Sequence, residues 1–103
     1  MDVLVTYDVA TVDREGQRRL SQVASICERY GTRVQYSVFE CRLDAALLER
    51  LKGELADAID PSKDVIDVYQ LDRTFDEVRT SLGLARSPRG SGAWIFRASP
   101  NLR

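Results

Sequence analysis

RVQYSVFEC, residues 33–41, is the stretch that decides the fold of this chain. Its β-branched and aromatic residues favour a strand. Strict alternation along it predicts two faces, one with Val34, Tyr36 and Val38 and the other with Gln35, Ser37 and Phe39. No Asn-Gly or Gly-Gly turn interrupts the run. It is therefore either one bent strand or two short strands joined by a kink.

Other segments on both sides of this stretch also favour strands. Residues 3–7 form a β-branched apolar run that stops at Asp8 and suits a buried strand. Residues 65–71 alternate well enough for another strand, and residues 93–96 form a short apolar one after a Ser/Pro/Gly-rich loop.

Helices are expected between these strands. Apolar residues recur at helical spacing in three intervals, residues 14–30, 44–59 and, more briefly, 74–82. Asp13 and Asp44 are the predicted N-caps of the first two helices. Gly31 is expected to end the first helix in the left-handed conformation.

The order of these elements predicts an α+β, ferredoxin-like βαββαβ sandwich with a C-terminal extra strand. The length of 103 residues fits one domain. We assign residues 1–85 to the ferredoxin-like domain and residues 86–103 to a loop and strand that can be exchanged with a partner subunit. A chain this short buries a modest core, so dimerisation would help to stabilise it.

Composition excludes several classes of protein. Apolar residues make up 44% of the chain, too many for a disordered protein. No apolar run approaches the ~18 residues of a membrane helix, and the N-terminus lacks the features of a signal peptide, so we expect a cytoplasmic protein. There is no histidine and there are only two cysteines, Cys27 and Cys41, which argues against zinc sites and histidine-based catalysis. Both thiols are expected in the core.

The net charge is −1, but the basic residues are unevenly distributed. The segment from Arg14 to Arg33 carries five arginines against only two acidic residues, and these arginines are Arg14, Arg18, Arg19, Arg29 and Arg33. Only two of the 15 basic residues are lysines, and arginine suits bidentate contacts to phosphate. The two interpretations are a basic surface for nucleic acid and a solvated surface on an arginine-rich chain.

Asp8 is the sharpest candidate for chemistry, because it lies where a strand ends and a loop can admit a ligand. Magnesium usually takes one or two carboxylates together with waters and substrate phosphates. A two-fold axis beside Asp8 would bring the second carboxylate from another subunit. A cation held there could lower the pKa of a water and stabilise charge on a phosphate. The alternative is that Asp8 only caps the following loop.

The other candidate residues flank Asp8 in the predicted fold. Arg18 and Arg19 lie near a helix N-terminus, where cations oppose the helix dipole, so they either bind phosphate or form a solvated face. Arg33 could point toward the same edge as Asp8. Tyr7 could orient Asp8 or simply pack against it. Phe39, with Ser37 in mid-strand, is more often core or dimer interface than a platform for a base.

Four strings together resemble the CRISPR-associated Cas2 family, and in particular its members from subtype I-C systems. They are VTYDV at 5–9, GQRRL at 16–20, YGTRVQYSVFEC at 30–41 and IDPSKD at 59–64. The resemblance implies a ferredoxin-like homodimer whose C-terminal strand joins the sheet of the partner, with the run through Ser37 divided into two strands. It also implies that Asp8 of each subunit holds a divalent metal, Mg²⁺ or Mn²⁺, across the axis.

The resemblance also implies a function. Members of the family are described as metal-dependent endonucleases that cut RNA or double-stranded DNA, and as the central dimer between two dimers of the CRISPR integrase during spacer acquisition. Arg18, Arg19, Arg33 and Phe39 fall at or near family positions implicated in handling nucleic acid. We therefore expect a CRISPR adaptation protein with a catalytic, metal-binding Asp8 and no membrane partner. The alternatives are a non-catalytic DNA scaffold and a small-ligand regulatory domain of the same fold.

Overall fold

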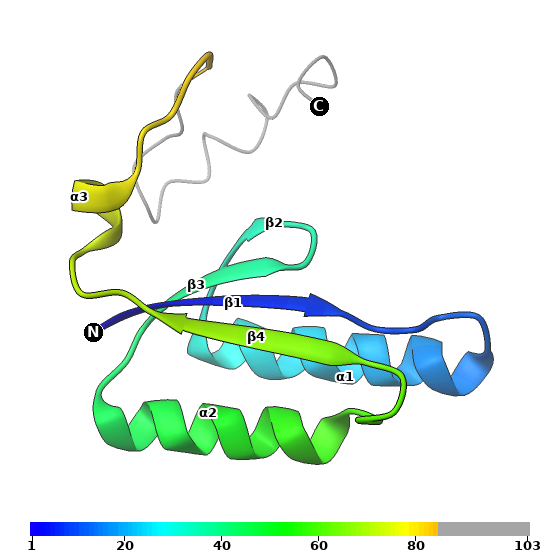
Figure 1. Ribbon diagram of the computed structural model, residues 1–103. Coiled ribbons are helices and arrows are strands. Elements are labelled where there is room, and N and C mark those ends of the chain that lie inside the picture. The colour runs from blue at the N-terminus through cyan, green and yellow to red at the C-terminus, as the bar shows by residue number, and fades with distance from the viewer. Residues whose placement is uncertain (85–103) are drawn as a thin grey trace.

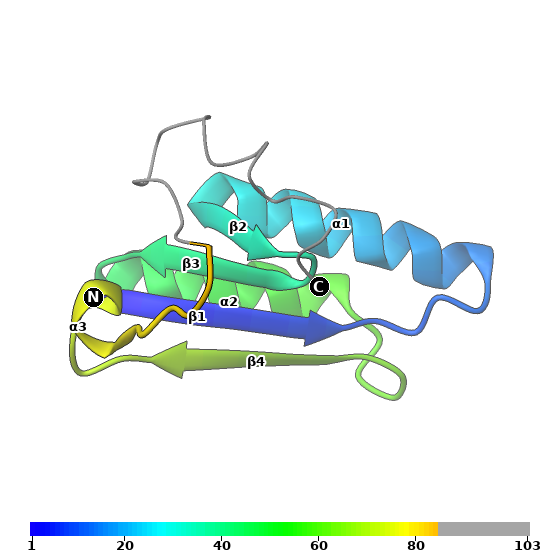
Figure 2. The ribbon, with the colours of Figure 1, turned by 90° about the horizontal axis from the view of Figure 1, so that it is seen from above.

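The computed structural model of this protein describes residues 1–84, which form one antiparallel sheet with two long helices on one face (Figure 1). The strand order is β2-β3-β1-β4, as Figure 2 shows from above. In chain order the elements are β1 (Asp2–Asp8), α1 (Arg14–Tyr30), β2 (Gly31–Gln35), β3 (Val38–Arg42), α2 (Ala45–Ala58), β4 (Val65–Gln70) and α3 (Phe75–Val78). The predicted ferredoxin-like α+β fold is confirmed. The predicted strand at 93–96 and the tail from 86 lie outside the described residues.

Alternation along the central strand β1 separates two chemically different faces of the sheet. Val3, Val5 and Tyr7 are buried against the helices. Leu4, Thr6 and Asp8 point to the opposite face because successive side chains of a strand alternate. Within residues 1–84, only the short helix α3 and the chain next to it lie on that second side, near the start of β1 (Figure 1). We call this second side the open face.

Both long helices begin where the sequence predicts. Asp13 accepts a hydrogen bond from the Gly16 amide, and Asp44 accepts one from the Leu47 amide, at 2.8 Å each. Each cap satisfies one of the free N–H groups of a first helical turn. The core between helices and sheet includes Val23 and Leu51, both fully buried.

Helix α1 ends before Gly31 as predicted, but the predicted left-handed conformation of Gly31 is wrong. Its backbone is extended, with φ −161° and ψ −163°, and not left-handed. A Cβ atom at this position would lie 2.4 Å from the Glu40 carbonyl oxygen and 2.5 Å from the Cys41 sulfur. Glycine is needed here because β2 starts directly from the helix and approaches β3 closely.

The stretch 33–41 consists of two strands, as the family resemblance implies. Tyr36 and Ser37 form the turn between β2 and β3, and the register shifts between Arg33 and Gln35. The predicted continuous alternation is therefore wrong: Tyr36 is 82% exposed in the turn, while Phe39 is fully buried. The third predicted helix is also shorter than expected and ends at Val78.

Both cysteines are buried free thiols, as predicted. Burial raises the pKa of the Cys27 thiol to about 12 and that of the Cys41 thiol to about 11. Such thiols are poor nucleophiles near neutral pH, because the thiolate is the reactive form. Among residues 1–84, no helix is both long enough and apolar enough to cross a bilayer.

Candidate metal and nucleic-acid site

Asp8 is the last residue of β1 and its side chain is exposed on the open face. Its backbone is fixed by pairing with Val65 at the start of β4, and the preceding Tyr7 amide donates to the Ser37 carbonyl at 3.2 Å. Within residues 1–84, the Asp8 carboxylate makes no hydrogen bond and no ion pair. A carboxylate on a rigid backbone and without a partner is available to a ligand.

The loop that follows Asp8 is held tightly. Val9 is buried in the core, and the Ala10 amide donates to Asp64 Oδ1 at 3.0 Å. The Ala10 carbonyl sits over Gly16 of α1 so closely that a Cβ there would lie 1.9 Å from its oxygen. The chain is therefore fixed on both sides of Asp8.

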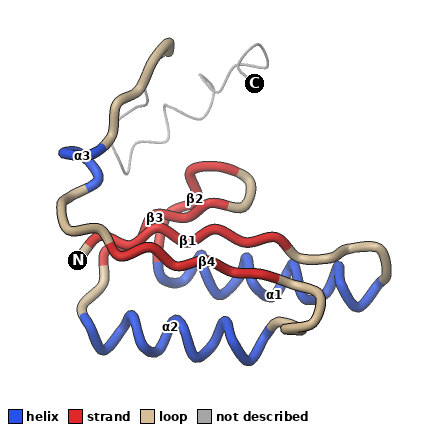
Figure 3. Tube along the Cα trace, viewed as in Figure 1, coloured by secondary structure: helices blue, strands red, loops and turns tan. Residues whose placement is uncertain are grey.

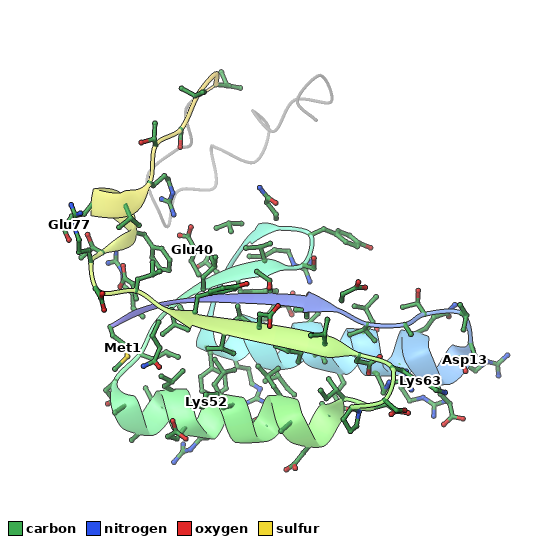
Figure 4. The ribbon with its side chains drawn as sticks, viewed as in Figure 1. Met1, Asp13, Glu40, Lys52, Lys63 and Glu77 are labelled. Carbon is green, nitrogen blue, oxygen red and sulfur yellow. The ribbon has the colours of Figure 1, made fainter. Side chains whose placement is uncertain are left out.

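Asp64, in the loop before β4, is the partner that holds this loop. Its side chain is fully buried and accepts from Arg19 Nε at 2.8 Å, Arg19 Nη2 at 3.3 Å and the Asp60 amide at 2.9 Å, in addition to Ala10. The adjacent Arg19 guanidinium is the main reason that the pKa of Asp64 is lowered to about 2. Figure 3 shows the loops after β1 and before β4 at the same end of the sheet, where Figure 4 labels Asp13 and Lys63.

The structure separates the two neighbouring arginines at the start of α1. Arg18 is exposed and forms no ion pair or hydrogen bond within the described part of the chain. Arg19 is mostly buried, with 17% of its side chain exposed, and is bound to Asp64. Of the two, only Arg18 presents a free guanidinium to a phosphate in this structure.

Arg33 does not join Asp8. It pairs in the sheet with Phe39, its guanidinium lies 5.2 Å from the centre of the Phe39 ring, and it approaches Glu28 of α1 at 3.9 Å. These contacts place Arg33 on the side of the helices, whereas Asp8 points to the open face. The fully buried Phe39 ring is core, which was the preferred interpretation of its sequence position.

Tyr7 also points to the side of the helices. Its hydroxyl lies 3.5 Å from the Tyr36 carbonyl, to which it donates. Burial raises the pKa of the Tyr7 hydroxyl, and a hydrogen bond with Arg33 opposes that rise. Tyr7 therefore packs beneath the β2–β3 turn, whose Ser37 is half-buried, and is not positioned to touch the Asp8 carboxylate directly.

A single described chain offers an incomplete metal site. Among residues 1–84, no three aspartate, glutamate, cysteine or histidine side chains gather to hold an ion. Asp8 fits a hard cation as one oxygen ligand, because Mg²⁺ uses one or two carboxylates and keeps several waters. Asp67, which pairs with Thr6 on β4, is the nearest exposed carboxylate of the same face, and a second copy of Asp8 from another molecule would complete the pair. On the open face, half-exposed Val65 lies beside Asp8, and half-exposed Tyr69 lies farther along β4, opposite Leu4.

Sequence reasoning missed Asp64. Its contacts reach Ala10 and Arg19, 54 and 45 positions away along the chain. Asp64 ends the string IDPSKD, which carried the family resemblance but no role for this residue, and an acidic residue before a predicted strand usually caps a turn.

Comparisons with known proteins agree on one family. A sequence model of the family described as "CRISPR associated protein Cas2" matches residues 1–77. The CRISPR-associated endonuclease Cas2 of Halalkalibacterium halodurans is 48% identical over 75 residues, which cover 73% of this chain and 78% of that protein. The CRISPR-associated endoribonuclease Cas2 of Nitratidesulfovibrio vulgaris is 49% identical over 71 residues, which cover 69% of this chain and 70% of that protein. The crystal structure of Streptococcus pyogenes Cas2 at pH 6.5 superimposes with a TM-score of 0.72 at 43% identity, covering 81% of this chain and 100% of that one.

Proposed function

The chain belongs to the CRISPR-associated Cas2 family, and on that premise we propose that it is a metal-dependent endonuclease of CRISPR adaptation that works as a homodimer. The observation that carries the proposal is the Asp8 carboxylate, which is exposed, without a partner within residues 1–84, and fixed by the backbone on both sides. Relatives named as endonuclease and endoribonuclease favour the nuclease over a non-catalytic scaffold.

Asp8 from each of two subunits would hold the divalent cation, which we propose is Mg²⁺ or Mn²⁺. Such a cation, when bound, supplies Lewis acidity for hydrolysis of a phosphodiester. The residues of the chain do the remaining work. The paired strands β1 and β4 hold the Asp8 backbone, and the exposed Arg18 neutralises phosphate charge of RNA or duplex DNA.

The homodimer is proposed to form through the open face. That face carries Asp8 with half-exposed Val65 beside it and half-exposed Tyr69 farther along β4, opposite Leu4. Burying such side chains against a second copy removes apolar surface from water and places the two Asp8 residues near the axis. We further propose, from family membership, that this dimer binds CRISPR integrase dimers during spacer acquisition.

The test is cleavage of matched RNA and duplex DNA by the parent protein and by Asp8→Asn, with Mg²⁺, with Mn²⁺ and with a chelator. A metal ligand that stabilises transition-state charge contributes several kcal/mol, so Asp8→Asn should cut more than about 100-fold more slowly. The matched control is Asp57→Asn, which removes an exposed carboxylate from α2. Equal cleavage by Asp8→Asn and the parent would reject the nuclease and favour the scaffold.

A further inference from the structure

We propose that Arg19 and Asp64 are positioning residues for the Asp8 carboxylate, and that Arg19 acts through Asp64 and not by contact with nucleic acid. This inference rests on the proposed metal site at Asp8. It assigns a role to Asp64, which the sequence did not indicate, and it changes the role that the sequence suggested for Arg19.

The first step is the geometry of Asp64. Its two oxygens receive the Ala10 amide at 3.0 Å, the Asp60 amide at 2.9 Å and two nitrogens of Arg19 at 2.8 and 3.3 Å. Asp64 directly precedes Val65, the residue that pairs with Asp8. The buried Asp64 carboxylate thus fixes two segments: the loop that follows Asp8 and the loop that leads into β4.

The second step is that Arg19 completes this arrangement. Asp64 has no exposed side-chain surface, and an unpaired charge there would be strongly unfavourable. Arg19 supplies the opposite charge, and its Nη2 also lies 3.5 Å from the Ala10 carbonyl. Ala10 lies two positions after Asp8. Its N–H donates to Asp64, and its C=O is approached by Arg19.

The position of Asp8 matters because its carboxylate is proposed to share a cation with that of a second subunit. Two Asp8 side chains from separate subunits must meet at one cation, so a shift of the loop is doubled across a two-fold axis. Functional groups work when they are held within about 0.5 Å of the productive geometry. Residues that orient metal ligands from behind change metal affinity or activity by about 10- to 100-fold when mutated.

The experiment uses Arg19→Lys, Asp64→Asn and the double variant in the full-length protein. Each single variant should lower cleavage and weaken Mn²⁺ binding by about 10- to 100-fold, and the double variant should lose no more than either single one. Affinity for nucleic acid and its dependence on salt should remain those of the parent. Arg18→Ala is the comparison for direct contact, since losing one phosphate contact lowers the salt slope by about 0.9.

Asp64→Asn separates the two roles most sharply. If Arg19 binds phosphate, removing the charge of Asp64 frees the guanidinium and tightens binding without loss of cleavage. If Arg19 positions Asp8, cleavage falls although the protein has become less negative. Tighter binding with full cleavage would overturn the proposal.

Amide hydrogen exchange of residues 9–11 without metal gives a readout that does not depend on activity. Exchange should accelerate in Asp64→Asn and Arg19→Lys, but not in the exposed α2 controls Asp57→Asn and Arg50→Lys. Thermal melts identify any variant that fails to fold. If Asp64→Asn fails to fold, Arg19→Lys still tests the proposal, because it keeps a positive charge beside Asp64. Unchanged exchange in both positioning variants would overturn the proposal. If the parent cuts no better than Asp8→Asn, the proposed nuclease fails, and exchange and Mn²⁺ binding still decide the positioning role.

Discussion

Asp2 and Asp8 stand at opposite ends of the same strand and on the same face of it, yet they have opposite environments. Asp2 is buried, accepts a hydrogen bond from the Phe75 amide at 2.7 Å and lies 3.5 Å from Arg42 Nε. Asp8 is exposed and has no partner within the described residues. The same side chain thus closes the fold at one end and is left free at the other.

The environments of Asp2 and Asp8 differ because the chain after β4 folds back over the Asp2 end of β1. Helix α3 comes back over the start of β1, where Figure 4 labels Glu40 on the open face. Glu40 pairs with Arg79 just after that helix, and Asp2 binds its first amide. At the Asp8 end, the loops run toward α1 and the side of the helices (Figure 3), so their contacts hold the backbone and, within residues 1–84, leave the open face uncovered there.

The exposed Asp8 carboxylate is positioned by its rigid backbone and not by side-chain partners within residues 1–84. At the Asp2 end, the side chain itself makes the structural contacts. At the Asp8 end, Asp64 makes the structural contact by accepting from the Ala10 amide, and Gly16 leaves room for the Ala10 carbonyl. The structural contacts are thus made around Asp8 and not by its own carboxylate.

The largest effect on stability should come from Gly16→Ala. The new Cβ would meet the Ala10 carbonyl at 1.9 Å, so the loop behind Asp8 must move. Overpacking of this kind costs about 1–3 kcal/mol of the free energy of unfolding, and a clash with backbone belongs at the upper end. Gly53→Ala in α2 is the matched control, because a Cβ added there would have nothing within 4 Å of it. That control should raise stability by about 0.5–1 kcal/mol in denaturant unfolding. Equal effects at the two glycines would show that the loop is not tightly held.

The next effect should come from Asp2→Ala, which removes the hydrogen bond from the Phe75 amide to the Asp2 carboxylate. Losing a hydrogen bond to a charged group costs about 1.5–3 kcal/mol, and chemical denaturation measures that loss. Asp2→Asn keeps an oxygen that can accept the bond and should lose less. If Asp2→Ala is as stable as the parent, α3 does not depend on this contact and the proposed contrast between the ends of β1 fails.

Local sequence patterns predicted the elements of this fold but not the contacts around its site. Helix α1 and its cap Asp13 follow from spacing and residue type within one segment. Gly31 was misinterpreted because a glycine after a helix usually adopts the left-handed conformation, whereas here the reason is the close approach of Glu40. Local patterns carry no information about that distant strand.

The candidate site divides in the same way. Asp8 could be proposed because the end of an apolar strand is visible in the sequence, and its role as a ligand stays a prediction. The roles of Arg18 and Arg19 could not be distinguished, because neighbouring positions on a helix point in different directions and only tertiary contacts show which one is paired. Asp64 was missed because all its decisive partners except Asp60 are remote in sequence.

A smaller effect, confined to acid, should come from the titration of Asp64. Its pKa is lowered from 3.8 to about 2, chiefly by Arg19, so the folded state binds a proton less readily than the unfolded chain. The resulting stability is fully present above about pH 4 and is lost as the pH falls toward about 2. The unfolding free energy of Asp64→Asn should therefore decline less steeply than that of the parent over this window. Glu54, Asp60 and Glu77 also have lowered pKa values, but they titrate in both proteins. Parallel curves would contradict the assignment of this proton to Asp64.

The smallest effect on stability should come from Asp8→Ala, although the same change should abolish cleavage. An exposed side chain without partners in the described fold contributes within about 0.5 kcal/mol to the free energy of unfolding. Denaturant unfolding below the concentration at which the dimer forms isolates this quantity, because it keeps any interface effect out of the measurement. A loss as large as that of Asp2→Ala would mean that Asp8 closes the fold as Asp2 does, and a carboxylate engaged in that way would be a poor ligand for a shared cation.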